Sequence, residues 1–112
     1  MILILSNKWD VTVDFVVREL RRRSVEFLRI NTEDLVADGM NVRYPGPLVS
    51  LGKAGNLREM NEGLSAVWNR RPGKPYDFFP IVDRPSEAVQ KFVSDQWFSC
   101  LEALELLDGV RW

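Results

Sequence analysis

The chain has 112 residues, of which 46% are hydrophobic and 28% charged, the ordinary balance of one soluble globular domain. Its formal net charge is −1, which excludes a general attraction to nucleic acid or to an anionic membrane surface. There is no histidine, the commonest general base and metal ligand, and the one cysteine, Cys100, allows no intrachain disulfide and fits a reducing, cytoplasmic setting.

The first 30 residues predict a strand, a helix and a second strand. Residues 2–5 form a continuous apolar run, typical of a strand buried on both faces but too short to span a membrane. The run also lacks the charged lead and the cleavage site of a signal peptide. Asp10 or Thr12 can cap a helix whose apolar stripe consists of Val13, Val16, Val17 and Leu20. Residues 25–30 form the second strand, and such a unit is parallel with a right-handed crossover.

The middle of the chain predicts a β-hairpin and a third strand. Apolar residues alternate over 40–44, a Tyr-Pro-Gly-Pro turn occupies 44–47, and further apolar residues follow up to Leu51. Residues 52–63 are polar and contain glycine, which indicates a loop. The apolar residues 64–68 indicate another strand, and the following residues 72–80 are rich in proline.

The last predicted element is a long helix from about Arg84 to about Leu107, with Asp83 as its cap, Pro85 in its first turn and Gly109 after its end. Its predicted buried stripe consists of Val89, Phe92, Val93, Trp97, Cys100, Leu101, Leu104 and Leu107. The fold class is therefore α/β, a three-layer Rossmann-like domain over 1–112 with a mostly parallel sheet, an edge hairpin and flanking helices. Residues 110–112 resemble the start of another strand, which indicates a domain cut from a longer protein.

No residue in the sequence is assigned a catalytic or metal-binding role. The loop 6–10 after the first strand contains no glycine, so neither a dinucleotide fingerprint nor a P-loop is present. No serine has a histidine to activate it, and Cys100 lies on an apolar stripe. Lys8 and the pair Glu33-Asp34 are interpreted as solvated surface residues rather than as an anion site or an acid–base pair. We therefore expect a domain that binds, positions or assembles.

Arg70 and Arg71 are the most informative polar residues. They follow a predicted buried strand, at the edge where open α/β sheets place ligands. A guanidinium group suits a carboxylate or a phosphate, in a ligand or in a neighbouring domain. An internal salt bridge to an acid such as Asp77 or Asp83 is the alternative, and the sequence leaves both open. Arg29 and Asn31, at the end of the second strand, are expected at the same edge.

Arg21, Arg22 and Arg23 raise the alternative of a small nucleic-acid binder with stacking tryptophans. A solvated helix end explains them better, because acidic residues balance them across the chain. We therefore expect neither a nucleic-acid partner nor a membrane partner.

Three stretches together resemble one known family. They are residues 1–6 with 25–34, then Ser65-Ala66-Val67-Trp68-Asn69-Arg70-Arg71-Pro72, and the long helix closing on residues 107–112. The chain resembles the N-terminal, pre-ATP-grasp domain of ATP-grasp ligases that modify ribosomally made peptides, such as the microviridin and marinostatin macrocycle ligases. Ribosomal-protein-S6-type glutamate ligases are more distant relatives. Nearly the whole chain takes part, although Asn69 stands where the family commonly has tyrosine.

This resemblance implies an activity of a longer protein. Such ligases use ATP and Mg²⁺ to phosphorylate a carboxylate, and an amine or hydroxyl then attacks the acyl phosphate to form an amide or an ester. The ATP and metal sites lie beyond residue 112, so the chain alone is expected to be inactive and no catalytic residue is carried over. The implied partners are the remaining domains, a peptide or amino-acid substrate, and a second copy in a homodimer. The alternative is a free-standing Rossmann-like binding or assembly module without an enzyme attached.

Overall fold

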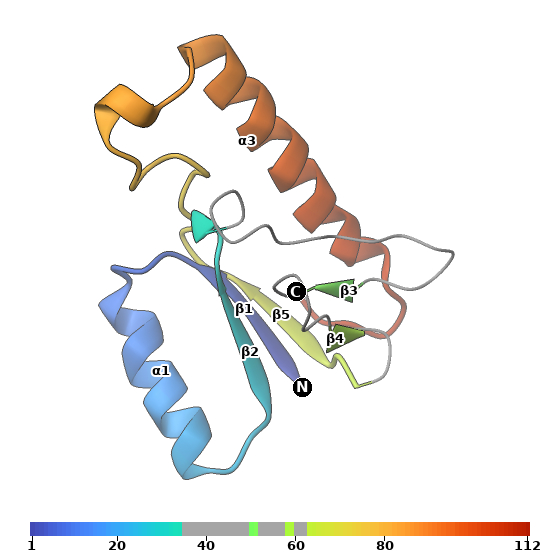
Figure 1. Ribbon diagram of the computed structural model, residues 1–112. Coiled ribbons are helices and arrows are strands. Elements are labelled where there is room, and N and C mark those ends of the chain that lie inside the picture. The colour runs from blue at the N-terminus through green and yellow to red at the C-terminus, as the bar shows by residue number, and fades with distance from the viewer. Residues whose placement is uncertain (35–49, 52–57, 60–62) are drawn as a thin grey trace.

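Three parallel strands form the central sheet of the computed structural model, which describes residues 1–34, 50–51, 58–59 and 63–112 (Figure 1). β1 (Ile2–Ser6) lies in the middle, with β2 (Phe27–Asn31) on one side and β5 (Ala66–Asn69) on the other. The three predicted strands are confirmed, although β2 and β5 each begin two residues later than expected. Because all three run in the same direction, their C-terminal ends lie together along one edge of the sheet, here called the carboxyl edge.

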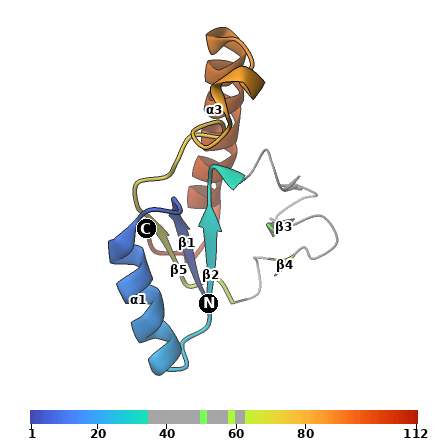
Figure 2. The ribbon, with the colours of Figure 1, turned by 60° about the vertical axis from the view of Figure 1, so that its left-hand side comes forward.

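The two faces of the sheet are covered by different helices, which gives a three-layer α/β architecture (Figures 1 and 2). Leu3 and Leu5 of β1 belong to the core on one face, and Ile4 belongs to the core on the other. Successive side chains of a strand point to opposite faces, so a strand covered on both sides must be apolar at every position. The predicted Rossmann-like fold class is confirmed.

Helix α1 (Val11–Arg22) covers the face of the sheet that carries Ile4. Asp10 is its N-cap, and the Oδ1 atom of Asp10 accepts a hydrogen bond of 3.2 Å from the backbone N–H of Val13. Val13 and Val17 are buried against the sheet, as the apolar stripe predicts. The sequence therefore specifies both the start of α1 and its buried side.

The arginine cluster at the end of α1 is organised by Glu19. Arg22 and Arg23 both donate hydrogen bonds to the Glu19 carboxylate, at 2.7 to 2.8 Å and 2.5 Å. The bonds from Arg22, and then those from Arg23, lower the pKa of Glu19 from 4.5 to about 2. These arginines are thus held by an acid of their own helix, which agrees with the interpretation of a solvated helix end.

We expect Glu19 to make stability depend on pH in acid. Its folded pKa lies below its unfolded value, so its contribution is fully present above pH 4.5 and is lost as the pH falls toward 2. The variant Glu19→Gln should flatten this part of the stability curve and lower stability at pH 7 by the same amount, which is small because the site is exposed and screened by solvent. Urea unfolding at several pH values measures the effect, and Glu105→Gln, an exposed glutamate outside the cluster, is the control. An unchanged pH profile in Glu19→Gln would contradict the expectation.

The last helix is shorter than the sequence predicts. α3 spans Glu87–Glu102, and its N-cap is Ser86 rather than Asp83, which ends the 3₁₀-helix η1 (Ile81–Asp83). A second 3₁₀-helix, η2 (Ala103–Leu106), follows α3 directly. Pro85 therefore precedes the helix, and Gly109 has a positive φ of 77° in the turn after η2. The expectation of one helix from 84 to 107 was wrong at both ends.

Only the C-terminal half of α3 packs on the sheet, on the face opposite to α1. Leu101 and Leu104 are buried in the core with Leu3 and Leu5. Farther up the helix, Val89 is 45% exposed and Phe92 is 65% exposed, so the predicted buried stripe was wrong for these two residues. Figures 1 and 2 show that this end of α3 extends past the carboxyl edge. The N-terminal half of α3 therefore lies beyond the carboxyl edge of the sheet.

The remaining described strands lie outside the central sheet. β3 (Ser50–Leu51) and β4 (Arg58–Glu59) pair antiparallel in a sheet of their own. The predicted hairpin over 40–51 falls mostly outside the described residues, and the described pair joins 50–51 to 58–59 instead. Next to β5, Arg111 makes a parallel bridge with Ala66, so the predicted start of a further strand at 110–112 is found there.

Candidate functional site

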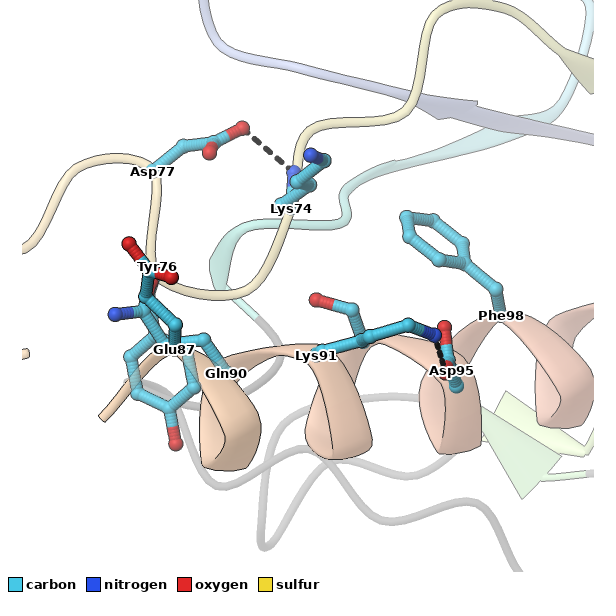
Figure 3. A pocket seen from close by; sticks show the side chains of 9 residues that line it. Lys74, Tyr76, Asp77, Glu87, Gln90, Lys91, Asp95 and Phe98 are labelled. Carbon is cyan, nitrogen blue, oxygen red and sulfur yellow. Dashed lines mark hydrogen bonds and ion pairs between the residues drawn. The ribbon is translucent and has the colours of Figure 1, made fainter. Parts of the chain in front are cut away.

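An open groove lies between residues 74–77 and the protruding half of α3, and we call it the α3 groove (Figure 3). Its volume is about 630 Å³. It is lined by Lys74, Tyr76, Asp77, Glu87, Gln90, Lys91, Ser94, Asp95 and Phe98. A smaller cavity of about 260 Å³ also has Phe98 in its wall, together with residues of β1 and β5. The two spaces therefore adjoin at Phe98, beyond the carboxyl edge.

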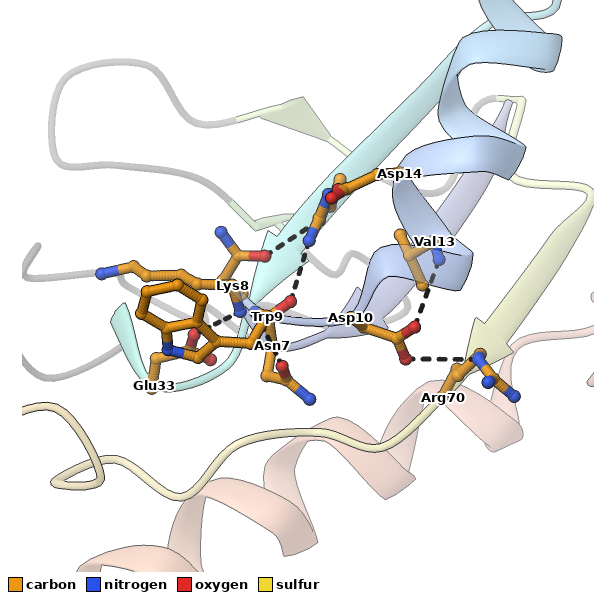
Figure 4. A network of polar contacts seen from close by, with 10 residues as sticks. Asn7, Lys8, Trp9, Asp10, Val13, Asp14, Glu33 and Arg70 are labelled. Atoms are coloured by element: carbon orange, nitrogen blue, oxygen red, sulfur yellow. Dashed lines mark hydrogen bonds and ion pairs between the residues drawn. The ribbon is translucent and has the colours of Figure 1, made fainter.

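Beside the groove, three segments meet at the carboxyl edge in a network of polar contacts, the edge network (Figure 4). They are the loop 7–10 after β1, residues 32–34 after β2, and residues 70–73 after β5. Parallel strands end at the same edge, so residues far apart in the sequence are brought together here. The predicted site residues Arg29, Asn31, Arg70 and Arg71 all belong to these segments or to the strands that lead into them.

Arg29 and Asn31 do lie together, and Arg29 holds the loop after β1. Its Nε atom donates to Asn31 Oδ1 at 2.9 Å, and its Nη2 atom donates to the backbone oxygen of Asn7 at 2.8 Å. Its Nη1 atom forms an ion pair with Asp14 of α1. The guanidinium group is thus already bonded on three sides within the domain, and its role here is to position the loop.

Arg70 forms an internal ion pair, but its partner is Asp10 rather than Asp77 or Asp83. Arg70 Nε lies 3.2 Å from Asp10 Oδ2, and Arg70 Nη2 donates to Thr12 Oγ1 at 3.3 Å. Asp10 is only 7% exposed. The same carboxylate therefore caps α1 with one oxygen and meets the end of β5 with the other.

Arg71 differs from its neighbour because its side chain is exposed. Its φ of 46° lies in the left-handed region, which is uncommon for a residue with a side chain. Its backbone oxygen accepts a hydrogen bond of 2.6 Å from Asn7 Nδ2, which ties this turn to the loop after β1. Within the described ranges the Arg71 guanidinium has no acidic partner, so of the three arginines it is the one presented outward.

Glu33 and Thr32 have structural roles that the sequence did not predict. Glu33 is 3% exposed, and its Oε1 atom accepts a hydrogen bond of 2.6 Å from the backbone N–H of Lys8. A Cβ atom on Gly73 would lie only 2.7 Å from Glu33 Oε2, so the backbone passes close to the buried carboxylate. The interpretation of Glu33-Asp34 as a solvated pair was wrong for Glu33, while Asp34 forms an ion pair with Lys8.

We expect Thr32→Val to destabilise the domain although it keeps the shape of the side chain. Thr32 is fully buried, and its hydroxyl donates a bond of 2.6 Å to the backbone oxygen of Gly73. Valine leaves that oxygen without its donor, which lowers the free energy of unfolding by about 1–3 kcal/mol. Thr12→Val, which removes an exposed hydroxyl acceptor, is the matched control and should change stability by less than about 1 kcal/mol. Equal losses in the two variants, measured by urea unfolding, would contradict this role for Thr32.

The hydrogen bonds and the ion pair of the edge network hold the three segments in place. Ser6 is fully buried, and Cys100 is half-buried on α3. Among the described residues, no group of three or more acidic, cysteine or histidine side chains is placed to hold a metal ion. No helix in the described part of the chain is long and apolar enough to cross a membrane.

Solved structures of larger proteins contain this fold. The sequence matches no protein-family model and no curated protein. The macrocyclase MdnC of Microcystis aeruginosa MRC, solved with its precursor peptide MdnA, matches 98% of this chain with a TM-score of 0.77 and 18% identity. The macrocyclase MdnB of the same organism matches 99% with a TM-score of 0.70 and 17% identity.

A third similar structure is a RiPP-associated ATP-grasp ligase of Chryseobacterium gregarium in complex with ADP and a leader and core peptide. It matches 92% of this chain with a TM-score of 0.57 and 19% identity. The match covers only 30% to 36% of the length of the three proteins. At these identities the comparison establishes the fold, and it confirms at that level the resemblance stated from the sequence.

Proposed function

We propose that the chain is the N-terminal, pre-ATP-grasp domain of an ATP-grasp ligase that acts on a peptide or amino-acid carboxylate. One observation carries the proposal: nearly the whole chain superposes on one part of three larger proteins, two peptide macrocyclases and a RiPP-associated ATP-grasp ligase. The family motif read from the sequence, residues 65–72, lies in β5 and in the turn that forms the edge network. Fold and motif therefore support the same assignment independently.

In this proposal the domain binds and positions, and the chemistry takes place elsewhere in the longer protein. ATP and Mg²⁺ would be held by later domains, where a carboxylate is activated as an acyl phosphate and attacked by an amine or hydroxyl. The described residues supply a fixed carboxyl edge, in which Arg29 is hydrogen-bonded and Arg70 is ion-paired within the domain. Arg71 is left to contact an anionic group of another domain or of the substrate.

Exposed apolar side chains give further support to the docking of another domain. On η1, Ile81 is 82% exposed and Val82 is 90% exposed, and Phe92 of α3 lies nearby in sequence with 65% of its surface exposed. Trp112, the last residue of the sequence, is 44% exposed. Exposed apolar side chains on neighbouring elements, such as η1 and the protruding half of α3, are typical of a surface that another protein surface covers. A second copy of the chain could cover the same surface in a homodimer.

Sequencing the reading frame past codon 112 and assaying its whole product tests the proposal. We expect the frame to continue into ATP-grasp sequence, and we expect the purified product to bind ATP and turn it over with a candidate peptide. The 112-residue chain alone should turn over no ATP. A stop codon after Trp112, or a longer product that neither binds nor hydrolyses ATP, would refute the ligase assignment. The free-standing binding module would then be the better description.

The role of Arg71 can be tested within the same longer protein. Replacing Arg71 with alanine is expected to lower kcat/KM by about tenfold, the effect of losing one charge-assisted hydrogen bond. The variant should leave the thermal unfolding of the 112-residue chain unchanged, because the side chain is exposed and unpaired in the described structure. Unchanged activity, or an unfolding temperature that drops with the activity, would contradict a contact role.

A further inference from the structure

The α3 groove has different chemistry at its two ends. Glu87 stands in the first turn of α3, and Phe98 stands 11 residues later on the same helix (98 − 87 = 11). At 1.5 Å per residue, about 16 Å separates the two along the helix axis. Figure 3 shows Glu87 and Tyr76 at one end of the groove and Phe98 at the other. An extended peptide of about five residues has this length.

The outer end of the groove is acidic. Asp77 and Glu87 both line it, and within the described residues neither carboxylate has a cationic partner. Asp77 Oδ2 accepts the backbone N–H of Lys74 at 2.7 Å, and Arg84 donates to the backbone oxygen of Asp77 rather than to its carboxylate. Lys91 is already engaged by Asp95 one turn later. A basic group would therefore be attracted to this end.

The inner end of the groove is apolar. Phe98 forms its wall and is shared with the adjoining cavity of about 260 Å³. That cavity is lined further by Leu5, Asn69, Pro72, Leu101 and Glu102. A side chain of aliphatic or aromatic character would find apolar contacts on several sides there.

We propose that the α3 groove binds an extended peptide segment that carries a basic side chain at one end and an apolar side chain at the other. The basic group meets Asp77 and Glu87, and the apolar group enters the cavity beside Phe98. Lys74 lines the groove between these two ends. The groove has a volume of about 630 Å³ and adjoins the cavity of about 260 Å³, so its inner end has room for a side chain.

Titration of the ¹⁵N-labelled 112-residue chain with three short peptides tests this inference by NMR. The probe is an acetylated, amidated pentapeptide of lysine, glycine, serine, glycine and phenylalanine. One control peptide has glutamate in place of lysine, and the other has serine in place of phenylalanine. We expect the probe to shift the amide signals of residues 74–77 and 87–98, and each control to bind about tenfold more weakly.

Variants of the protein assign the effect to the two carboxylates. The double variant Asp77→Asn with Glu87→Gln keeps an acceptor for the Lys74 N–H, so the groove should retain its shape while it loses its preference for lysine over glutamate. Glu105→Gln with Asp108→Asn removes two exposed charges outside the groove and should leave that preference intact. An absence of binding, equal affinity for the lysine and glutamate peptides, or an unchanged preference in the groove variant would each overturn the inference.

This test is separate from the test of the ligase assignment. It uses no ATP and reads binding to the groove directly, whereas the ligase assignment depends on the longer reading frame and its turnover of ATP. Peptide binding without ATP turnover would leave the inference standing and remove the ligase. ATP turnover without peptide binding at residues 74–77 and 87–98 would support the ligase assignment and overturn the inference.

Discussion

Replacing Leu104 with alanine is expected to lower the free energy of unfolding by about 2–5 kcal/mol, the usual loss for a buried leucine. Leu104 is fully buried in the core that joins η2 and the end of α3 to the sheet. The smaller side chain leaves a cavity against Leu3, Leu5 and Leu101, which the short strands cannot close. Urea unfolding followed by tryptophan fluorescence or circular dichroism measures the change.

The same substitution two residues later is the matched control. Leu106 also belongs to η2 but is 83% exposed, so Leu106→Ala should change stability by no more than about 0.5 kcal/mol. Similar losses at the two positions would show that η2 does not hold the helix on the sheet through Leu104. A large loss confined to Leu104 would establish that contact as the anchor of the protruding helix.

Replacing Asp10 with alanine is expected to cost about 2–4 kcal/mol, because one side chain serves two functions. Its Oδ1 atom caps α1, and its Oδ2 atom lies 3.2 Å from Arg70 Nε. Asp10 Oδ2 and Arg70 Nε are both buried, and the two atoms are not aligned as a hydrogen bond. The contribution of this ion pair to stability is therefore mainly electrostatic. Solvent reduces it, because the Arg70 side chain is 29% exposed.

A double-mutant cycle separates the cap from the ion pair. Asp10→Asn keeps an oxygen for the Val13 N–H but removes the charge, so it should lose less than Asp10→Ala. Combining Asp10→Ala with Arg70→Ala should give a coupling energy of about 1–3 kcal/mol. Additive losses in the double variant would mean that Arg70 is not stabilised by Asp10, and Arg70 would then remain a candidate for contact with an external anion.

These two experiments concern the same functional question, how the carboxyl edge and the α3 groove are held in position. The edge network fixes the loop after β1 through Asp10, Arg29 and Glu33. The core around Leu104 fixes the base of the helix that forms the other wall of the groove. A partner that docks beyond the strands would therefore meet two surfaces with a defined relative position.

Local features of the fold could be predicted because each depends on neighbouring residues. The run 2–5 is apolar at every position, which by itself indicates that both faces of β1 are covered. Asp10 needs only its place before an apolar stripe to cap α1, and Val13 and Val17 follow from the helical period. The sequence by itself determined these strands, the first helix and the parallel direction of the first two strands.

The tertiary structure alone decided which part of α3 is buried. A strand of five residues spans about 17 Å, whereas a helix of 16 residues spans about 24 Å, so α3 cannot lie wholly on the sheet. The helical period treats Phe92 and Leu101 alike, but only Leu101 lies over a strand. The α3 groove forms where the helix extends past the sheet. For the same reason, no sequence pattern predicts it.

The partners of the charged residues were likewise settled by the tertiary structure. Arg70 pairs with Asp10, 60 residues away (70 − 10 = 60), and Glu33 is buried against the backbone of Lys8 and Gly73. Composition and spacing identify such residues as charged and strand-terminal, but the distances between them depend on how the loops of three strands meet at one edge. Strand order and register are non-local, and they decide which charges are paired and which, like that of Arg71, are exposed at the surface.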